Sequence, residues 1–145
     1  MSSNEFILHP RLAADTCFVG DWPLCRLLLL NDARFPWLVL VPRRANVAEP
    51  FDLSDTDQLQ LHRESMALGR WMKANFRADK MNIAALGNQV PQLHVHHIAR
   101  FHDDPMFPAP VWGSVAQPYS AEALSERCEW LAGTLGAGCL EAVFS

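Results

Sequence analysis

The sequence predicts an α+β fold: an antiparallel sheet of about five strands, one long central helix and a C-terminal helix. Two observations predict it. Short apolar runs are separated by stretches that contain Gly, Asn or Pro, which is the pattern of adjacent antiparallel strands. One long stretch with helical spacing of its apolar residues interrupts these runs. Because the connections between strands are hairpin-like, they favour this arrangement over a parallel α/β sheet.

Five segments are expected as strands. The clearest pair is two apolar runs that flank a polar stretch containing Pro36, with Pro23 and Pro42 marking where pairing stops. A further pair is joined by a short stretch rich in Gly, Asn and Pro, which suits a tight antiparallel connection. In chain order the expected strands are residues 16–19, 24–30, 37–42, 81–86 and 92–99.

Two helices are expected. Ser54 followed by Asp57 is a helix-start signal, and apolar residues then fall on one stripe as far as Phe76. We therefore predict a helix over residues 54–76 that covers one face of the sheet. Ser120 opens a second helix, which has Leu124, Cys128, Leu131 and Leu135 on one stripe and is ended by Gly133, Gly136 and Gly138.

The composition limits the classes of protein to which the chain can belong. The chain has 145 residues, of which 50% are hydrophobic and 19% charged, so we expect residues 1–145 to form one domain, with 101–145 as a C-terminal extension. A formal net charge of −4 argues against nucleic-acid binding. No apolar run is long enough to cross a membrane, and the start of the chain lacks the pattern of a signal peptide. The four cysteines, at 17, 25, 128 and 139, form no Cys-x-x-Cys pair, so we expect reduced thiols and a cytoplasmic protein.

A histidine cluster is the main candidate for chemistry. His94, His96 and His97 fall within four residues of a predicted strand. Because side chains alternate along a strand, Gln92, His94 and His96 are expected on one face and His97 on the other. Imidazoles in this pattern can attack phosphorus, donate a proton or bind a metal. Surface or paired core histidines are the structural alternative, and a metal site formed with His102 is another.

The sequence around this cluster resembles a known family. Asn88-Gln-Val-Pro-Gln-Leu-His-Val-His-His-Ile-Ala-Arg100 resembles the signature strand of the histidine-triad (HIT) superfamily, which reads His-φ-His-φ-His-φ-φ, where φ is apolar. The likeness extends upstream to Leu27-Leu-Leu-Leu-Asn-Asp and Phe35-Pro-Trp-Leu-Val-Leu-Val-Pro-Arg43, which look like the nucleotide-binding hairpin of that family. It spans roughly residues 17–100.

The resemblance implies roles for three residues. His94 occupies the position of the nucleophile that forms a nucleotidyl-enzyme intermediate, and His96 the position of the third histidine, which lies near the phosphate. Gln92 stands where the family has its first histidine, and His97 where it has an apolar residue. A glutamine donates and accepts hydrogen bonds but does not change charge near pH 7.

The resemblance also implies a set of substrate-binding residues. Asn31 matches a residue that contacts the ribose, with Asp32 as a second candidate, and Asn82 resembles a polar residue near the phosphate. Asn88 and Gln89 match the segment whose amides hold phosphate oxygens. Turn residues are the structural alternative for Asn31 and Asn88.

The function implied is that of a nucleotide hydrolase or nucleotidyl transferase acting at an α-phosphate, on dinucleoside polyphosphates or nucleoside phosphoramidates. No cofactor is expected to be required, although Mg²⁺ can accompany a polyphosphate. The alternative is a non-catalytic nucleotide-binding sensor or scaffold, which the Gln92 variant leaves open. The resemblance further implies a homodimer formed through the sheet edge and the helix.

Overall fold

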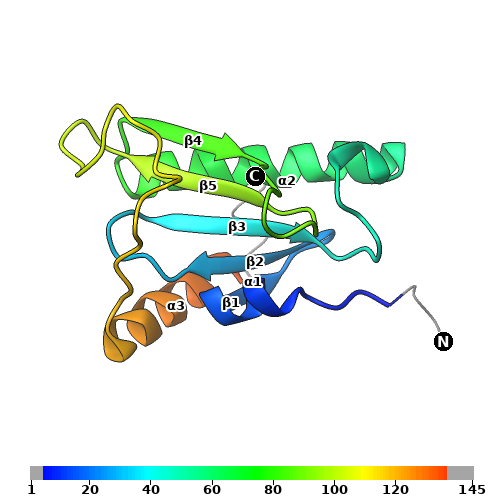
Figure 1. Ribbon diagram of the computed structural model, residues 1–145, viewed down its shortest axis with the longest axis horizontal. Coiled ribbons are helices and arrows are strands. Elements are labelled where there is room, and N and C mark those ends of the chain that lie inside the picture. The colour runs from blue at the N-terminus through cyan, green and yellow to red at the C-terminus, as the bar shows by residue number, and fades with distance from the viewer. Residues whose placement is uncertain (1–4, 137–145) are drawn as a thin grey trace.

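The chain forms a five-stranded antiparallel sheet in the order β1-β2-β3-β5-β4, with helices on both faces (Figure 1). The structure is a computed structural model that describes residues 5–136; Gly138 and Cys139 lie outside the described residues. None of the helices within that range is both long enough and apolar enough to span a membrane. The elements are α1 (Pro10–Asp15), β1 (Thr16–Asp21), β2 (Cys25–Leu30), β3 (Trp37–Pro42), a short 3-10 helix (Pro50–Asp52), α2 (Asp55–Asn75), β4 (Lys80–Ala84), β5 (Val95–Arg100) and α3 (Ala121–Leu135).

The two faces of the sheet are covered differently. Leu38 and Leu40 of β3 belong to the main core, which is closed by the apolar stripes of α2 and α3. Trp37, Val39 and Val41 point to the opposite face, where a second apolar cluster is covered by α1 and the segment between β5 and α3. Figure 1 shows α2 and α3 behind the sheet and α1 in front of it. The α+β prediction, with its antiparallel sheet and long helix, is confirmed.

Both predicted helices begin at the expected serine. The Ser54 hydroxyl accepts a hydrogen bond from the Asp57 amide, and the Ser120 hydroxyl accepts one from the Ala123 amide. These caps satisfy amides that the first helical turn leaves without a partner. The end of α3 differs from the prediction, because Gly133 lies inside the helix and the chain leaves it only at Gly136. Nothing lies within 4 Å of the place where a Gly133 side chain would sit.

The histidine strand is shorter than predicted. β5 begins at Val95, not at position 92, so Gln92 and His94 precede it. The strict alternation of faces therefore does not extend back to Gln92. Within β5 the alternation holds: Val95 and Ala99 face the helices, and Ile98 faces the other side.

A buried carboxylate joins α2 to the start of β2. Glu64 is fully buried, and its two oxygens accept hydrogen bonds from the backbone amides of Leu24 and Cys25, each at 2.9 Å. Gln60 donates a third bond, at 2.6 Å, from the preceding turn of the helix. The carboxylate thus satisfies two amides at the point where Pro23 interrupts pairing.

His97 is a core residue on the helix face, as the alternation predicts. Its Nδ1 lies 3.1 Å from the carbonyl of Val95 and its Nε2 lies 2.8 Å from the hydroxyl of Ser65 on α2. Since a carbonyl only accepts, Nδ1 carries the proton and Nε2 accepts from the hydroxyl. Burial lowers the pKa of His97 to about 4, so the ring is neutral at pH 7.

Replacing Glu64 with alanine is expected to lower the free energy of unfolding by about 2–5 kcal/mol, because it leaves two buried amides without an acceptor. Chemical denaturation at pH 7 measures this loss. The matched control is Glu129→Ala, an exposed residue of α3. Equal stability of the two variants would contradict the role given to Glu64.

Stability is expected to fall as the pH is lowered from about 6.5 to 4. The ordinary pKa of histidine is 6.5, whereas burial lowers the pKa of His96 and of His97 to about 4. Over this range the histidines of the unfolded chain bind protons that the buried rings of the folded chain do not. The free energy of unfolding therefore falls by up to about 3 kcal/mol for each ring. Denaturation from pH 7 to 4 should show a shallower pH dependence in His97→Asn than in the wild type. His102→Asn, whose ring is exposed, should retain the wild-type dependence.

Candidate active site

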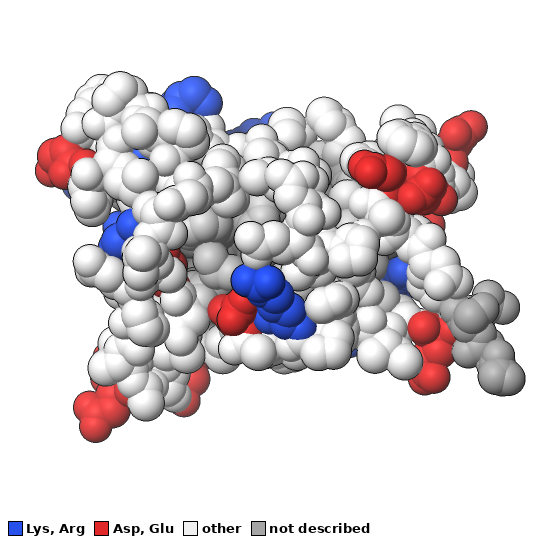
Figure 2. Space-filling model, in the orientation of Figure 1, with Lys and Arg blue, Asp and Glu red and all other residues white. Residues whose placement is uncertain are grey.

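A cavity of about 400 Å³ opens on the face of the sheet that carries α1. Its walls come from α1, the end of β2, the start of β3, residues 86–90 and the Trp112–Gly113 turn, and it contains the rings of His94 and His96. Figure 2 shows that this face of the molecule is largely uncharged. A mixed positive and negative group near its middle lies over α1, where Arg11 and Asp15 form an ion pair at 3.9 Å.

His94 is held by the backbone two residues before it. Its Nδ1 lies 2.7 Å from the carbonyl oxygen of Gln92. A carbonyl only accepts hydrogen bonds, so in the neutral ring Nδ1 carries the proton and Nε2 has the lone pair. The ring is 7% exposed and lines the cavity, and no partner for Nε2 is found among residues 5–136.

His96, on β5, lies beside His94, which precedes the strand. The two ring centroids are 4.9 Å apart, with an angle of 75° between the planes. The indole Nε1 of Trp37, on the neighbouring strand β3, donates a hydrogen bond of 2.9 Å to Nδ1 of His96. Burial is the main cause that lowers the pKa of His96 to about 4, with the nearby rings of His94 and His97 adding to it. His96 is therefore neutral at pH 7.

Asn88 and Gln89 are brought to the cavity. They follow Gly87, whose backbone φ of +71° turns the chain after β4, and all three line the cavity wall near the two histidines. Both side chains are exposed. Amide groups here can donate hydrogen bonds to an anion without adding net positive charge.

The side chain of Gln92 does not join the two histidines. Its Oε1 accepts a hydrogen bond of 2.8 Å from the His9 amide, and its Nε2 donates one of 2.9 Å to the Ile7 carbonyl. The expectation that Gln92 shares a face with His94 and His96 is therefore wrong, because the strand begins only at Val95. What Gln92 contributes to the site is its backbone carbonyl.

Asn31 and Asp32 do not line the cavity. The side-chain oxygen of Asn31 accepts from the Tyr119 amide at 2.9 Å. Asp32 is fully buried and pairs with Arg34 at 2.7 Å. Burial acts to raise the pKa of Asp32, but the hydrogen bonds and charge of Arg34 outweigh it and hold the pKa below its ordinary value. Asn31 holds the segment that precedes α3 directly, and Asp32 holds it through Arg34, which also bonds Ser114.

Asn82 is also engaged away from the cavity. Its Oδ1 accepts a hydrogen bond of 3.0 Å from Arg100. Arg100 is 1% exposed and forms a buried ion pair of 2.8 Å with Asp104, whose oxygens also accept from the amides of Phe101, Met106 and Phe107. This network orders the turn that follows β5.

Other cavity residues were not predicted from sequence. Arg11 and Asp15 lie on α1, which was not expected, although Pro10 at its first turn and His9 at its cap are helix-start signals. Trp37 was assigned to a strand but not to the site. The pairing of Val39 with His96 across β3 and β5 places Trp37 on the same face, and sequence alone does not give that register.

The alternative metal site is not assembled. His102 lies 3.6 Å from Asp79 and stacks edge-on against Phe107, away from the other histidines. Among residues 5–136, no group of three His, Cys, Asp or Glu side chains is placed to hold a metal ion.

Known proteins share this architecture. The HIT domain family model matches residues 11–103. A histidine triad protein from Marinobacter aquaeolei is 47% identical, with 90% of this chain and 96% of that chain covered and a TM-score of 0.86. One from Bradyrhizobium japonicum is 44% identical, with 88% and 96% covered and a TM-score of 0.83.

A more distant structure shares the fold alone. The Plasmodium falciparum diadenosine triphosphate hydrolase is 17% identical, with 100% of this chain and 89% of that chain covered and a TM-score of 0.60. No curated protein matches the chain. The family match over residues 11–103 and the identity to two histidine triad proteins establish that this chain belongs to the HIT family.

Proposed function

We propose that the chain is a nucleotide hydrolase or nucleotidyl transferase that works through a covalent nucleotidyl-His94 intermediate. The observation that carries this proposal is the bond from His94 Nδ1 to the Gln92 carbonyl, which leaves a bare ring nitrogen in the cavity. A neutral imidazole nitrogen with a free lone pair is a nucleophile for phosphorus. Membership of the HIT family supports the same proposal.

The reaction proceeds in two steps. Nε2 of His94 forms a bond to the α-phosphorus of the nucleotide, and the bond from phosphorus to the leaving group breaks with its electron pair going to the leaving group. Water then forms a bond to phosphorus and loses a proton to solvent, while the electron pair of the phosphorus–nitrogen bond returns to Nε2. The product is a nucleoside monophosphate. An acceptor other than water would make the same intermediate a transfer reaction.

The substrate proposed is a nucleotide with an anhydride or amide bond at its α-phosphate, such as a dinucleoside polyphosphate or a nucleoside phosphoramidate. The name of the distantly related Plasmodium hydrolase supports the first class. Asn88 and Gln89 are proposed to bind phosphate oxygens, because they line the cavity beside His94. Asn31, Asp32 and Asn82 would then support the cavity walls without touching the substrate. Mg²⁺ can accompany a polyphosphate.

A non-catalytic nucleotide sensor is the second candidate. The observation that favours it is Gln92, whose side chain holds the N-terminal segment and offers no group to the cavity. Such a protein would bind nucleotides in the same cavity without turnover.

Incubation with a diadenosine polyphosphate and with a fluorogenic adenosine phosphoramidate is expected to release adenosine monophosphate. His94→Ala should reduce the rate to background, because the attacking nitrogen is lost. His102→Ala, a histidine outside the cavity, is the matched control and should retain activity. Acid-quenched mass spectrometry should detect the nucleotide on His94. Tight nucleotide binding without turnover of either substrate would favour the sensor instead.

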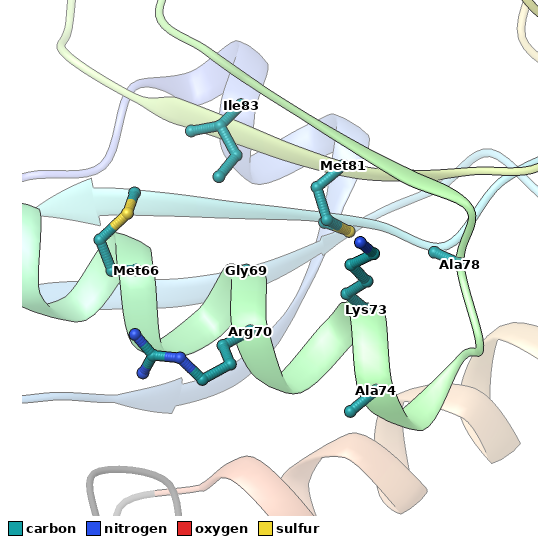
Figure 3. A pocket seen from close by; sticks show the side chains of 8 residues that line it. All are labelled: Met66, Gly69, Arg70, Lys73, Ala74, Ala78, Met81 and Ile83. Atoms are coloured by element: carbon teal, nitrogen blue, oxygen red, sulfur yellow. The ribbon is translucent and has the colours of Figure 1, made fainter.

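We further propose that two copies of the chain pair through β4 and α2, as the family resemblance implies. Among residues 5–136, β4 is an edge strand that pairs with β5 alone, which leaves its outer edge open to a strand of a second copy. A groove of about 540 Å³ runs beside it (Figure 3). Met66 of α2 and Ile83 of β4 lie on its two sides and are 36% and 39% exposed. Gly69 on its floor allows close packing, since a side chain there would lie 3.1 Å from Ile83.

Ile83→Glu is expected to convert the dimer to a monomer, because a two-fold interface would bring two added negative charges together in place of apolar contacts. Light scattering after size exclusion should give twice the chain mass for the wild type and 16.3 kDa for the variant. Val115→Glu, at an exposed valine in the loop before α3, is the matched control. A single-chain mass for the wild type at all concentrations would contradict the dimer.

A further inference from the structure

The indole of Trp37 determines which nitrogen of His96 carries the proton. An indole N–H only donates hydrogen bonds, and here it points at Nδ1 of His96 from 2.9 Å. Nδ1 must therefore be the acceptor, and in the neutral ring the proton lies on Nε2. No hydrogen-bond partner for this Nε2 is found among residues 5–136, and the ring lines the cavity.

The two cavity histidines are thus held in opposite tautomers. His94 donates from Nδ1 to a carbonyl and keeps a bare Nε2, whereas His96 accepts at Nδ1 and keeps its proton on Nε2. With the ring centroids 4.9 Å apart, one cavity presents a nucleophilic nitrogen and a hydrogen-bond donor side by side. A donor placed there can stabilise the charge that develops on a phosphoryl oxygen.

Trp37 is itself firmly placed. It is 6% exposed at the start of β3, where it pairs with Ile98 of the histidine strand. The ring of Trp112 packs edge-on against Trp37 at 6.2 Å and against His96 at 5.6 Å. Trp112 therefore contacts the His96 ring without a hydrogen bond to its Nδ1. A change at Trp112 alters the packing of His96, whereas a change at Trp37 also removes its hydrogen bond.

His96 is held in its neutral form by its surroundings. Burial lowers its pKa to about 4, and a second proton would have to sit on Nδ1, against the N–H of Trp37. A neutral imidazole can stabilise charge by a hydrogen bond but is too weak an acid to give its proton away at neutral pH.

Among residues 5–136, no other group that faces His96 supplies a proton in its place. His94 is the nucleophile, and His97 lies on the opposite face against Ser65. The other charged residues that line the cavity are Arg11, which does not release a proton, and its partner Asp15, an acceptor when ionised. Gln92, where the resemblance places a histidine, has no proton to give.

We propose that Trp37 is a positioning residue that fixes His96 as a hydrogen-bond donor rather than a proton donor, so that the site favours leaving groups that depart without protonation. This inference rests on the proposed function. A phosphate leaving group accepts the electron pair of the broken phosphorus–oxygen bond as a stable anion. An amine leaving group must gain a proton as the phosphorus–nitrogen bond breaks, and that proton would have to come from solvent. The site therefore prefers phosphoanhydrides to phosphoramidates.

The tautomers can be measured without any substrate. Long-range proton–nitrogen correlation spectra of ¹⁵N-labelled protein at pH 7 should show His96 protonated at Nε2 and His94 at Nδ1. Trp37→Phe should shift His96 toward a mixture of tautomers or the charged form, while Trp112→Phe should retain the wild-type pattern. A wild-type His96 protonated at Nδ1, or an unchanged pattern in Trp37→Phe, would overturn the inference.

Kinetics test the consequence. In Trp37→Phe, kcat for a diadenosine polyphosphate should fall about tenfold with little change in KM, because a fixed donor to the transition state is lost. The ratio of phosphoramidate to polyphosphate turnover should rise at pH 6, because His96 becomes free to take up and transfer a proton. An unchanged ratio would overturn the inference. A failure to label His94 would instead count against the proposed function, and the spectra would be unaffected by it.

Discussion

The candidate site depends on one hydrogen bond, from Nδ1 of His94 to the backbone carbonyl of Gln92. The carbonyl is available because β5 does not begin until Val95, so it is not used in the sheet ladder. Since the acceptor is backbone, the bond does not depend on which side chain occupies position 92. A glutamine can therefore stand at this position without releasing the His94 ring, and its side-chain amide is free to hold the N-terminal segment.

The two faces of the sheet divide stability and chemistry between them. The helix face buries most of the apolar side chains, together with Glu64 and His97, whose side-chain polar atoms are all hydrogen-bonded within the protein. Among residues 5–136, the other face is covered by α1 and the residues just before it, by residues 86–90 and by the segment after β5, and the cavity opens there. Because this cover is thin, it needs interactions that hold it against the sheet. The ion pairs Asp32–Arg34 and Arg100–Asp104 do this from beneath the segment.

An acidic chain with a net charge of −4 can still present a site suited to an anion. The cavity relies on neutral rings and amide groups, and its one guanidinium is paired with Asp15. Arg34, between β2 and β3, and Arg100, at the end of β5, are each paired with a buried carboxylate. Oriented dipoles, rather than net positive charge, are therefore what the cavity offers to an anion.

The sequence by itself determined the α+β class, the capped long helix, the strand segments and the identity of the two cavity histidines, because these follow from local periodicity, capping residues and a short motif. It also placed Asn88 and Gln89 in the loop beside the site. Only the tertiary structure decided the partners of polar side chains. Asn31, Asn82 and Gln92 each bond to residues far away in the chain. Trp37 meets His96 only through the register of β3 on β5. Hydrogen bonds between distant segments depend on how strands are aligned, and no local pattern encodes that alignment.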